Sequence, residues 1–336
     1  MKDIIEKLCN APGVSGYEHE AAAVFEKLVA PYCSEVKKDA AGNVIAIKKS
    51  GRHNAVKIMI EAHTDKIGLM VKHITDDGCI LFSRIGGIDT KIIPAGKVVI
   101  YGREKIYGVI GAVPPHVSRG DGKKAPKAED LCVDTGLSAQ KLAELVSVGD
   151  VMEFDTSFTQ LLGKRIAASA CDDRAGVAIL VKCLMLLQNE QVDADVYAVA
   201  AVQEEVGLRG AGVATTEIEP DIAICVDVCH GKTPDASDNV FEAGGGTVIT
   251  VGPNIHPEVS ERLISLAREK EIAYQIDADG GDTGTDTWIV QVRGKGVKTG
   301  LLSIPLRYMH TPYEVMDSTD AEATASLICE FIKGVK

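Results

Sequence analysis

Residues 198–210, "AVAAVQEEVGLRG", begin with an apolar segment that stops, after Gln203, at two adjacent carboxylates, Glu204 and Glu205. A short apolar run of this kind is typical of a buried strand. The simplest interpretation of the two acids is that the strand reaches solvent where it ends. The alternative is that one acid binds a metal ion and the other transfers a proton. The rest of the chain has to decide between the two.

Apolar strands alternate with helices over most of the chain. We expect strands at 42–49, 55–63, 195–203, 221–229, 247–253, 273–279 and 300–310. Helices are expected at 2–10, 18–33, 175–189, 256–272, near 285–294 and from Asp317 onward. The segment 175–189 is apolar nearly all round, which indicates a buried helix. This alternation predicts an α/β fold with a mainly parallel central sheet flanked by helices.

Residues 67–160 interrupt this alternation. Glycines recur there at short intervals, and short strands such as "GKVVIYG" and "KIYGVIGAV" replace helical patterns, apart from "SAQKLAELV". We therefore expect a small β-rich domain at 67–160, inserted into a discontinuous α/β domain made of residues 1–66 and 161–336. The polar stretch 118–130, "SRGDGKKAPKAED", is predicted to be an exposed loop.

Composition excludes several classes of function. The chain has 336 residues and a net charge of −12, which argues against nucleic-acid binding because phosphates require clustered Lys and Arg. No apolar run is long enough to span a bilayer, so no membrane role is expected. The amino terminus lacks the features of a signal peptide, and the nine cysteines contain no CxxC pair. These features predict a cytoplasmic protein with reduced thiols.

Polar residues with metal-ligand chemistry recur at the predicted strand ends. Each one alone has an ordinary structural explanation, such as a helix N-cap for the aspartates that precede the helix at 175–189. Together they form an ordered set of imidazoles and carboxylates that suits two ions of zinc, cobalt or manganese, with one bridging carboxylate and one acid left free. The set comprises His63, Asp65, Asp172, Asp173, Glu204, Glu205, Asp227 and His310.

With these motifs in place, the sequence resembles the TET-type dimetal aminopeptidases, a family that includes glutamyl and deblocking aminopeptidases and some proteins labelled endoglucanases. The motifs that carry the resemblance cover nearly the whole chain: "APGVSGYE", "AHTDKIG", "DDRAG", "QEEVGLRGA", "VDV", "GGDTGTD" and "RYMHTPYE". It implies a metal-dependent aminopeptidase that removes N-terminal residues from short peptides. It also implies two divalent ions per subunit and a homo-oligomer, in which dimers formed by the inserted domain assemble into a tetrahedral dodecamer.

The resemblance also implies a role for each site residue. His63 and Asp227 would bind one ion, Glu205 and His310 the other, and Asp172 would bridge them. Glu204 would be the general base, and Asp65 would orient His63. The peptide bond between Asp172 and Asp173 would be cis. No residues that bind the substrate's side chain can be named from the sequence.

Two positions near these motifs are open to more than one interpretation. Lys66 is either a solvated side chain at a domain junction or a residue that faces the cleft, whereas Cys171 is expected to pack away from the ions. The loop "GGDTGTD" is either a turn beside the substrate pocket or a purely structural turn.

Rival functions remain at this point. The same ligand types serve dimetal carboxypeptidases and deacylases, but in those enzymes the extra domain usually follows the later ligands. A glycoside hydrolase would leave both histidines unused, and a single Trp gives it little surface for sugar stacking. A non-catalytic scaffold would be expected to have lost Glu204 or a ligand.

Overall fold

The computed structural model describes residues 1–112, 125–234 and 240–336. An eight-stranded sheet forms its centre, in the order β1-β2-β12-β3-β13-β16-β14-β15. The strands are parallel across β12/β3, β3/β13, β13/β16 and β14/β15 and antiparallel elsewhere. Their bounds are β1 Glu35–Lys38, β2 Val44–Lys48, β3 Lys57–His63, β12 Asp195–Ala201, β13 Ile222–His230, β14 Thr247–Val251, β15 Tyr274–Ala278 and β16 Lys298–Leu306.

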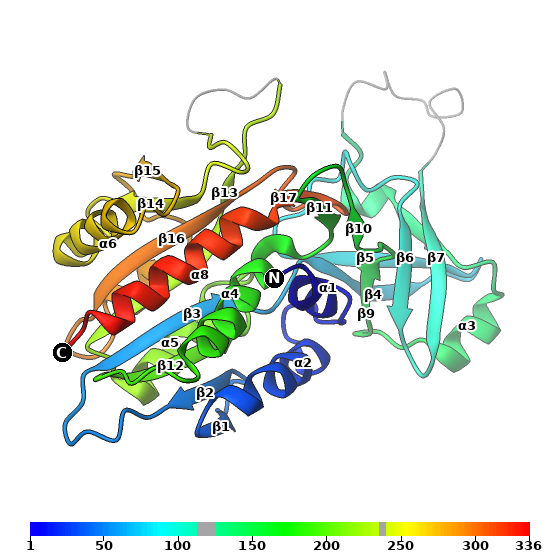
Figure 1. The fold of residues 1–336 in the computed structure, drawn as a ribbon. Helices are drawn as coiled ribbons and strands as arrows, with labels where there is room; N and C mark the ends of the chain where they lie inside the picture. Colours follow the sequence, from blue (N-terminus) through cyan, green and yellow to red (C-terminus); the bar gives the residue numbers. More distant parts are fainter. Residues whose placement is uncertain (113–124, 235–239) are drawn as a thin grey trace.

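Helices cover both faces of this sheet. The long helices α4 and α8 lie side by side across one face (Figure 1). Their apolar side chains form one core cluster with α1, α2, α6 and the strands, whereas α5 and α7 close the opposite face. The bounds are α1 Lys2–Cys9, α2 His19–Val29, η1 Ala30–Tyr32, α4 Cys171–Leu187, α5 Arg209–Ile218, α6 Pro257–Glu269, α7 Thr287–Gln291 and α8 Ser318–Lys333. The predicted α/β fold with its central sheet is confirmed.

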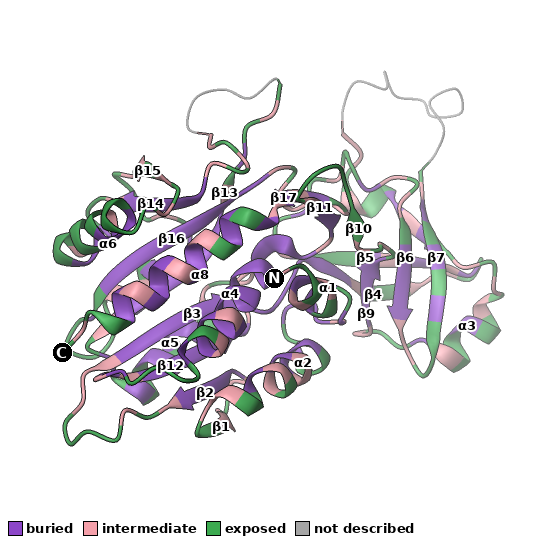
Figure 2. Cartoon of the chain, viewed as in Figure 1, coloured by how far each residue is buried: buried purple, intermediate pink, exposed green. Residues whose placement is uncertain are grey.

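Burial follows how many faces of each element are covered by its neighbours. Strands β3, β12 and β13 are buried along nearly their whole length, because helices cover both of their faces (Figure 2). Helix α4 is buried nearly all round, as its continuous apolar sequence predicts. The outer helices α2 and α6 instead bury one stripe and expose the other.

A closed six-stranded barrel lies beside the sheet (Figure 1) and has its own apolar core. Its strand order is β4-β5-β8-β7-β6-β9, with α3 (Ala139–Leu145) packed at one end. The strand bounds are β4 Gly68–Ile74, β5 Cys79–Ile85, β6 Lys97–Tyr101, β7 Lys105–Gly111, β8 Cys132–Asp134 and β9 Val151–Phe154. This barrel is the β-rich insertion expected from the sequence.

A small third sheet joins the two parts of the molecule. Its order is β10 (Thr159–Gln160), β11 (Arg165–Ala168) and β17 (Glu314–Asp317), all antiparallel. Part of the loop predicted at 118–130 (residues 118–124) lies outside the described residues, and the remainder contains the short helix η2 (Ala128–Asp130). Within the described parts of the chain, no helix is both long and apolar enough to span a membrane.

Candidate metal centre

Parallel strands bring the predicted site residues to one edge of the sheet. Strand β3 ends at His63, β12 leads into Glu204 and Glu205, and β13 carries Asp227 near its end. The carboxyl ends of parallel strands meet at the same edge, where α/β proteins bind their ligands. The loop after β16 adds His310, and the first turn of α4 adds Asp172.

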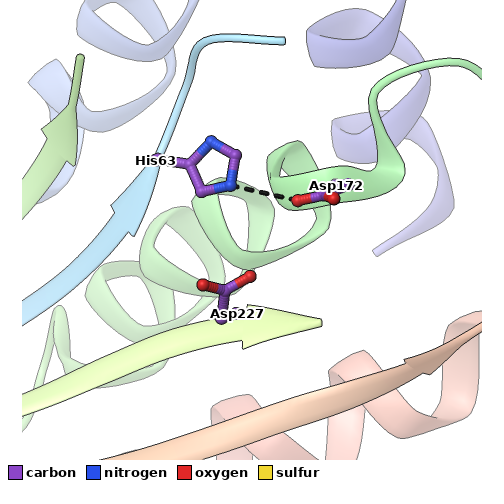
Figure 3. A group of neighbouring side chains, drawn as sticks. All are labelled: His63, Asp172 and Asp227. Carbon is purple, nitrogen blue, oxygen red and sulfur yellow. Dashed lines mark hydrogen bonds and ion pairs between the residues drawn. The ribbon is translucent and has the colours of Figure 1, made fainter. Parts of the chain in front are cut away.

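Two groups of side chains have their ligand atoms close enough to hold an ion. In the first, atoms of His63, Asp172 and Asp227 all lie within 4.8 Å of one another, and Figure 3 shows the three side chains converging on a common space. The second group comprises Asp172, Glu205 and His310, within the same limit. Asp172 belongs to both groups, because its Oδ1 lies 3.0 Å from His63 Nε2 and its Oδ2 lies 3.1 Å from His310 Nε2.

Asp65 connects three segments of the site. Its fully buried carboxylate accepts hydrogen bonds from the backbone N–H groups of Glu204 and Glu205, at 3.0 and 3.2 Å. The Ser15 hydroxyl donates to the same carboxylate at 2.5 Å, and His63 Nδ1 lies 3.5 Å from it. Asp65 therefore fixes the backbone of the two adjacent acids, and its main-chain carbonyl oxygen lies 3.2 Å from the same His63 Nδ1.

The second histidine is positioned from the barrel side. His310 Nδ1 lies 3.0 Å from the carbonyl oxygen of Gly87, in the loop after β5, so the imidazole donates there and leaves Nε2 free to bind an ion. Glu314 accepts hydrogen bonds from the backbone N–H of His310 at 3.0 Å and from that of Asp172 at 3.1 Å. A carbonyl of the inserted barrel thus orients a ligand of the α/β part.

The crowding of acids indicates that the centre requires positive charge. Burial raises the pKa of Asp227 well above its usual value, and burial together with neighbouring carboxylates raises the pKa of Glu204 to about 8. Two divalent cations would supply the missing positive charge, and imidazole with carboxylate is a donor set that suits zinc, cobalt or manganese. The residues present therefore fit a pair of ions.

Several residues around the centre were not found by sequence reasoning. Glu61, two residues before His63 in β3, is fully buried, and burial raises its pKa to about 8. Buried Arg174 donates to the carbonyls of Leu8, Ala11, Gly13 and Thr64, and so fastens the amino-terminal segment to the end of β3. Glu61 could have been found as an acid inside an apolar strand, whereas the carbonyl partners of Arg174 leave no signal in the sequence.

The structure also decides how Lys66 and Cys171 lie. Lys66 is not solvated but buried, with its ammonium group 2.8 Å from a carboxylate oxygen of Glu153 in β9. The interpretation of Lys66 as a solvated side chain was therefore wrong, because its ammonium group pairs with the Glu153 carboxylate of the barrel inside the domain junction. Cys171 is fully buried beside Cys9, as the packing interpretation expected, and the peptide bond between Asp172 and Asp173 is cis. All nine cysteines are free.

A cleft of about 470 Å³ opens over both groups of candidate ligands. Glu204 lines this cleft and belongs to neither ligand group, and its Oε2 lies 4.0 Å from His63 Nε2. Thr283, Gly284 and Thr285 of the loop "GGDTGTD" form part of the wall, which places this loop beside the cleft.

Known proteins match the chain over nearly its full length. The model of the M42 glutamyl aminopeptidase family matches residues 42–327. A lysyl aminopeptidase of Pyrococcus furiosus is 38% identical, over 99% of this chain and 97% of that protein. An aminopeptidase from the archaeon Desulfurococcus kamchatkensis has a similar structure, with a TM-score of 0.92 at 36% identity over 99% and 94% of the two chains. The TET1 peptidase of Pyrococcus horikoshii, described as able to assemble into a tetrahedron or a large octahedral shell, has a TM-score of 0.88 at 31% identity over 99% of both chains.

Proposed function

The chain belongs to the M42 glutamyl aminopeptidase family and is thus a peptide-bond hydrolase, and on this premise we propose a dinuclear metal-dependent aminopeptidase acting on short peptides with a free amino terminus. The observation that carries the proposal is the position of Asp172, whose two oxygens face His63 and His310 from one carboxylate. A bridging carboxylate of this kind is what a pair of ions 3.5–4 Å apart requires.

The proposed ligands follow from the two groups of side chains. His63 and Asp227 would hold one ion, Glu205 and His310 would hold the other, and Asp172 would contribute an oxygen to each. When bound, the two ions would lower the pKa of a water molecule and polarise the scissile carbonyl. Asp65 and the Gly87 carbonyl keep the imidazole rings oriented, because each interacts with a ring nitrogen.

Glu204 is the proposed general base. It lies in the cleft wall beside His63, outside both ligand groups, and so is free to take a proton from the attacking water and return it to the leaving amine. Positioned proton transfer of this kind adds a factor of about 10²–10⁴ to the rate. Asp65 holds the backbone of Glu204 in place through the hydrogen bond at 3.0 Å.

Assembly is the second part of the proposal. We propose that residues 67–160 form the dimerisation domain, that 1–66 and 161–336 form the catalytic domain, and that dimers build a dodecamer like the assemblies named for the TET1 relative. An enclosed assembly of this kind would admit only short peptides. The cytoplasmic location stays a prediction.

Hydrolysis of free and N-acetylated peptides tests the activity. Cleavage confined to free amino termini, lost in chelator and restored by zinc, cobalt or manganese, is the expected result. A Glu204→Gln variant should retain both ions by elemental analysis and lose at least about 10² in kcat. Release of carboxy-terminal residues, or cleavage of acylated substrates, would instead indicate a carboxypeptidase or deacylase. Full activity in chelator would contradict the metal mechanism.

A further inference from the structure

The wall of the cleft formed by β14 and β15 is acidic. Asp277 in β15 and Asp279 just after it both line the cleft, and their alternate spacing along the chain places them on the same side. Within the described ranges neither aspartate forms an ion pair with a lysine or arginine, and Asp279 only accepts the N–H of Gly281 at 2.7 Å. Burial and the neighbouring Asp279 raise the pKa of Asp277, as expected for two carboxylates that lack a cation.

A buried hydroxyl without a partner lies at the same wall. Thr250 in β14 is paired in register with Asp277, is 1% exposed and lines the cleft. Its Oγ1 makes no hydrogen bond to any described group. Buried polar groups without a partner are rare and costly, so this hydroxyl indicates a ligand that brings its own polar group into the cleft.

The charges that line the cleft indicate that this ligand is positively charged. The described residues that line the cleft include no lysine or arginine. In the proposed function, two divalent ions carry four positive charges, which match the four carboxylates Asp172, Glu204, Glu205 and Asp227. Asp277 and Asp279 are then left without a counter-charge, and a cationic group is the ligand that restores balance at their end of the cleft.

The distance between the strands of Asp227 and Asp277 indicates that the substrate's first residue has a long side chain. The order β13-β16-β14-β15 separates Asp227 from Asp277 by three strand spacings of about 4.8 Å, roughly 14 Å between backbones. Both carboxylates reach into the cleft, and Phe241 and Met309 supply apolar wall. The side chains of lysine and arginine suit this cleft, because their apolar stems can pack on these walls while the charged end group reaches the aspartates.

We propose that Asp277, Asp279 and the Thr250 hydroxyl bind the cationic side chain of the substrate's first residue, so that the enzyme prefers peptides beginning with lysine or arginine. This inference rests on the proposed aminopeptidase function. The ammonium or guanidinium group donates to both carboxylates and to the hydroxyl oxygen, while the free α-amine stays at the metal end of the cleft.

The experiment compares dipeptides that begin with lysine and with norleucine, its uncharged analogue of equal chain length, on the metal-loaded enzyme. We expect kcat/KM for lysine to exceed that for norleucine by about 10- to 100-fold, the range that a hydrogen-bonded charge contributes. Free lysine should also inhibit more strongly than free norleucine. The lysine-to-norleucine ratio should fall about tenfold in Asp277→Asn and in Asp279→Asn and approach one in the double variant, whereas Asp277→Glu should retain most of it.

The ratio is taken within each variant, so a general loss of activity cancels. Asp282→Asn is the matched control, because Asp282 is exposed, lies outside the cleft wall and loses the same charge. Equal rates for lysine and norleucine in the wild-type enzyme would overturn this inference while leaving the aminopeptidase intact. An unchanged ratio in the double variant, or an equal fall in Asp282→Asn, would also overturn it. Failure to hydrolyse any free peptide with metal present would instead overturn the proposed function.

Discussion

Gly87 shows how a residue without a side chain can control a metal ligand. Its carbonyl accepts the hydrogen bond of His310 Nδ1, and a Cβ added at position 87 would lie only 2.9 Å from that nitrogen and 3.3 Å from Cε1. Gly87→Ala must therefore push the imidazole away from the second ligand group. We expect affinity for the second ion and kcat each to fall about 10- to 100-fold, the usual effect of disturbing a group that orients a ligand. Isothermal titration with zinc measures the first quantity.

Gly111→Ala is the control for this prediction. A Cβ at that barrel glycine would meet its nearest neighbour at 3.7 Å, an ordinary contact, so the same chemical change should leave zinc affinity and rate unaltered. A Gly87→Ala variant with the zinc affinity of the wild type would mean that the orientation of the His310 imidazole does not depend on its close contact with position 87.

Sequence reasoning brought together the site residues whose positions follow from the ends of the strands that carry them. His63, Glu204, Glu205 and Asp227 could be grouped because the ends of parallel strands meet. Gly87 and Ser15 could not, because they reach the centre through loops whose paths depend on tertiary packing. Lys66 was misinterpreted for the same reason, since its partner Glu153 lies 87 positions away in the barrel.

At the scale of elements, the ion pair between Lys66 and Glu153 joins the end of β3 to β9 of the barrel. Glu153 also accepts the N–H of Gly13 at 2.6 Å and the Tyr101 hydroxyl at 3.2 Å, so one buried carboxylate holds three segments. We expect Glu153→Gln to lower the free energy of unfolding by about 3–5 kcal/mol, because it leaves the Lys66 ammonium buried without a counter-charge. Lys66→Met combined with Glu153→Gln should cost less, and the comparison is made by urea denaturation.

The same carboxylate predicts a dependence on pH. Burial favours the protonated acid, but Lys66 and Arg174 outweigh it and hold the pKa of Glu153 below its ordinary 4.5. Above pH 4.5 the carboxylate is ionised in both the folded and the unfolded chain, and the ion pair stabilises the fold fully. As the pH falls below 4.5 the unfolded chain takes up the proton before the folded chain does. The stabilisation therefore decreases and is lost once the pH has fallen through the lower pKa of the folded state. Melting temperatures between pH 6 and pH 3.5 should therefore fall more steeply in the wild type than in the double variant. Parallel curves would contradict this account.

Elements with long apolar runs could be predicted, and the shortest barrel strands could not. Helix α4 and strands β3, β12 and β13 carry long apolar runs that a buried position requires. The barrel strands β8 and β9 have three and four residues, too few for alternation to be distinguished from loop sequence. Their register is set by closure of the barrel, a constraint that acts across the whole insertion.

At the scale of the whole molecule, the proposed ions join parts that are distant in sequence. They would link β3, α4, β13 and the loop after β16, the last of which is held by the barrel. Ligands that bind only the folded state stabilise it, by about 2.7 kcal/mol at a concentration of 100 Kd. Chelator should therefore lower the melting temperature measured by calorimetry, and excess zinc should restore it. His63→Ala should show a smaller response, and an unchanged melting temperature in chelator would count against bound ions.

The proposed assembly requires an exposed contact surface on the barrel. Strand β7 of the barrel turns Tyr107 and Val109 outward, 63% and 44% exposed, which is apolar surface suited to a subunit contact. If the barrel mediates dimerisation, Tyr107→Glu combined with Val109→Glu should shift the mass from that of twelve subunits of 35.7 kDa, about 430 kDa, to much smaller species in light scattering. Leu162→Glu, at a 96% exposed position outside the barrel, should leave the mass unchanged. A full-sized assembly in the double variant would place the dimer contact on another surface.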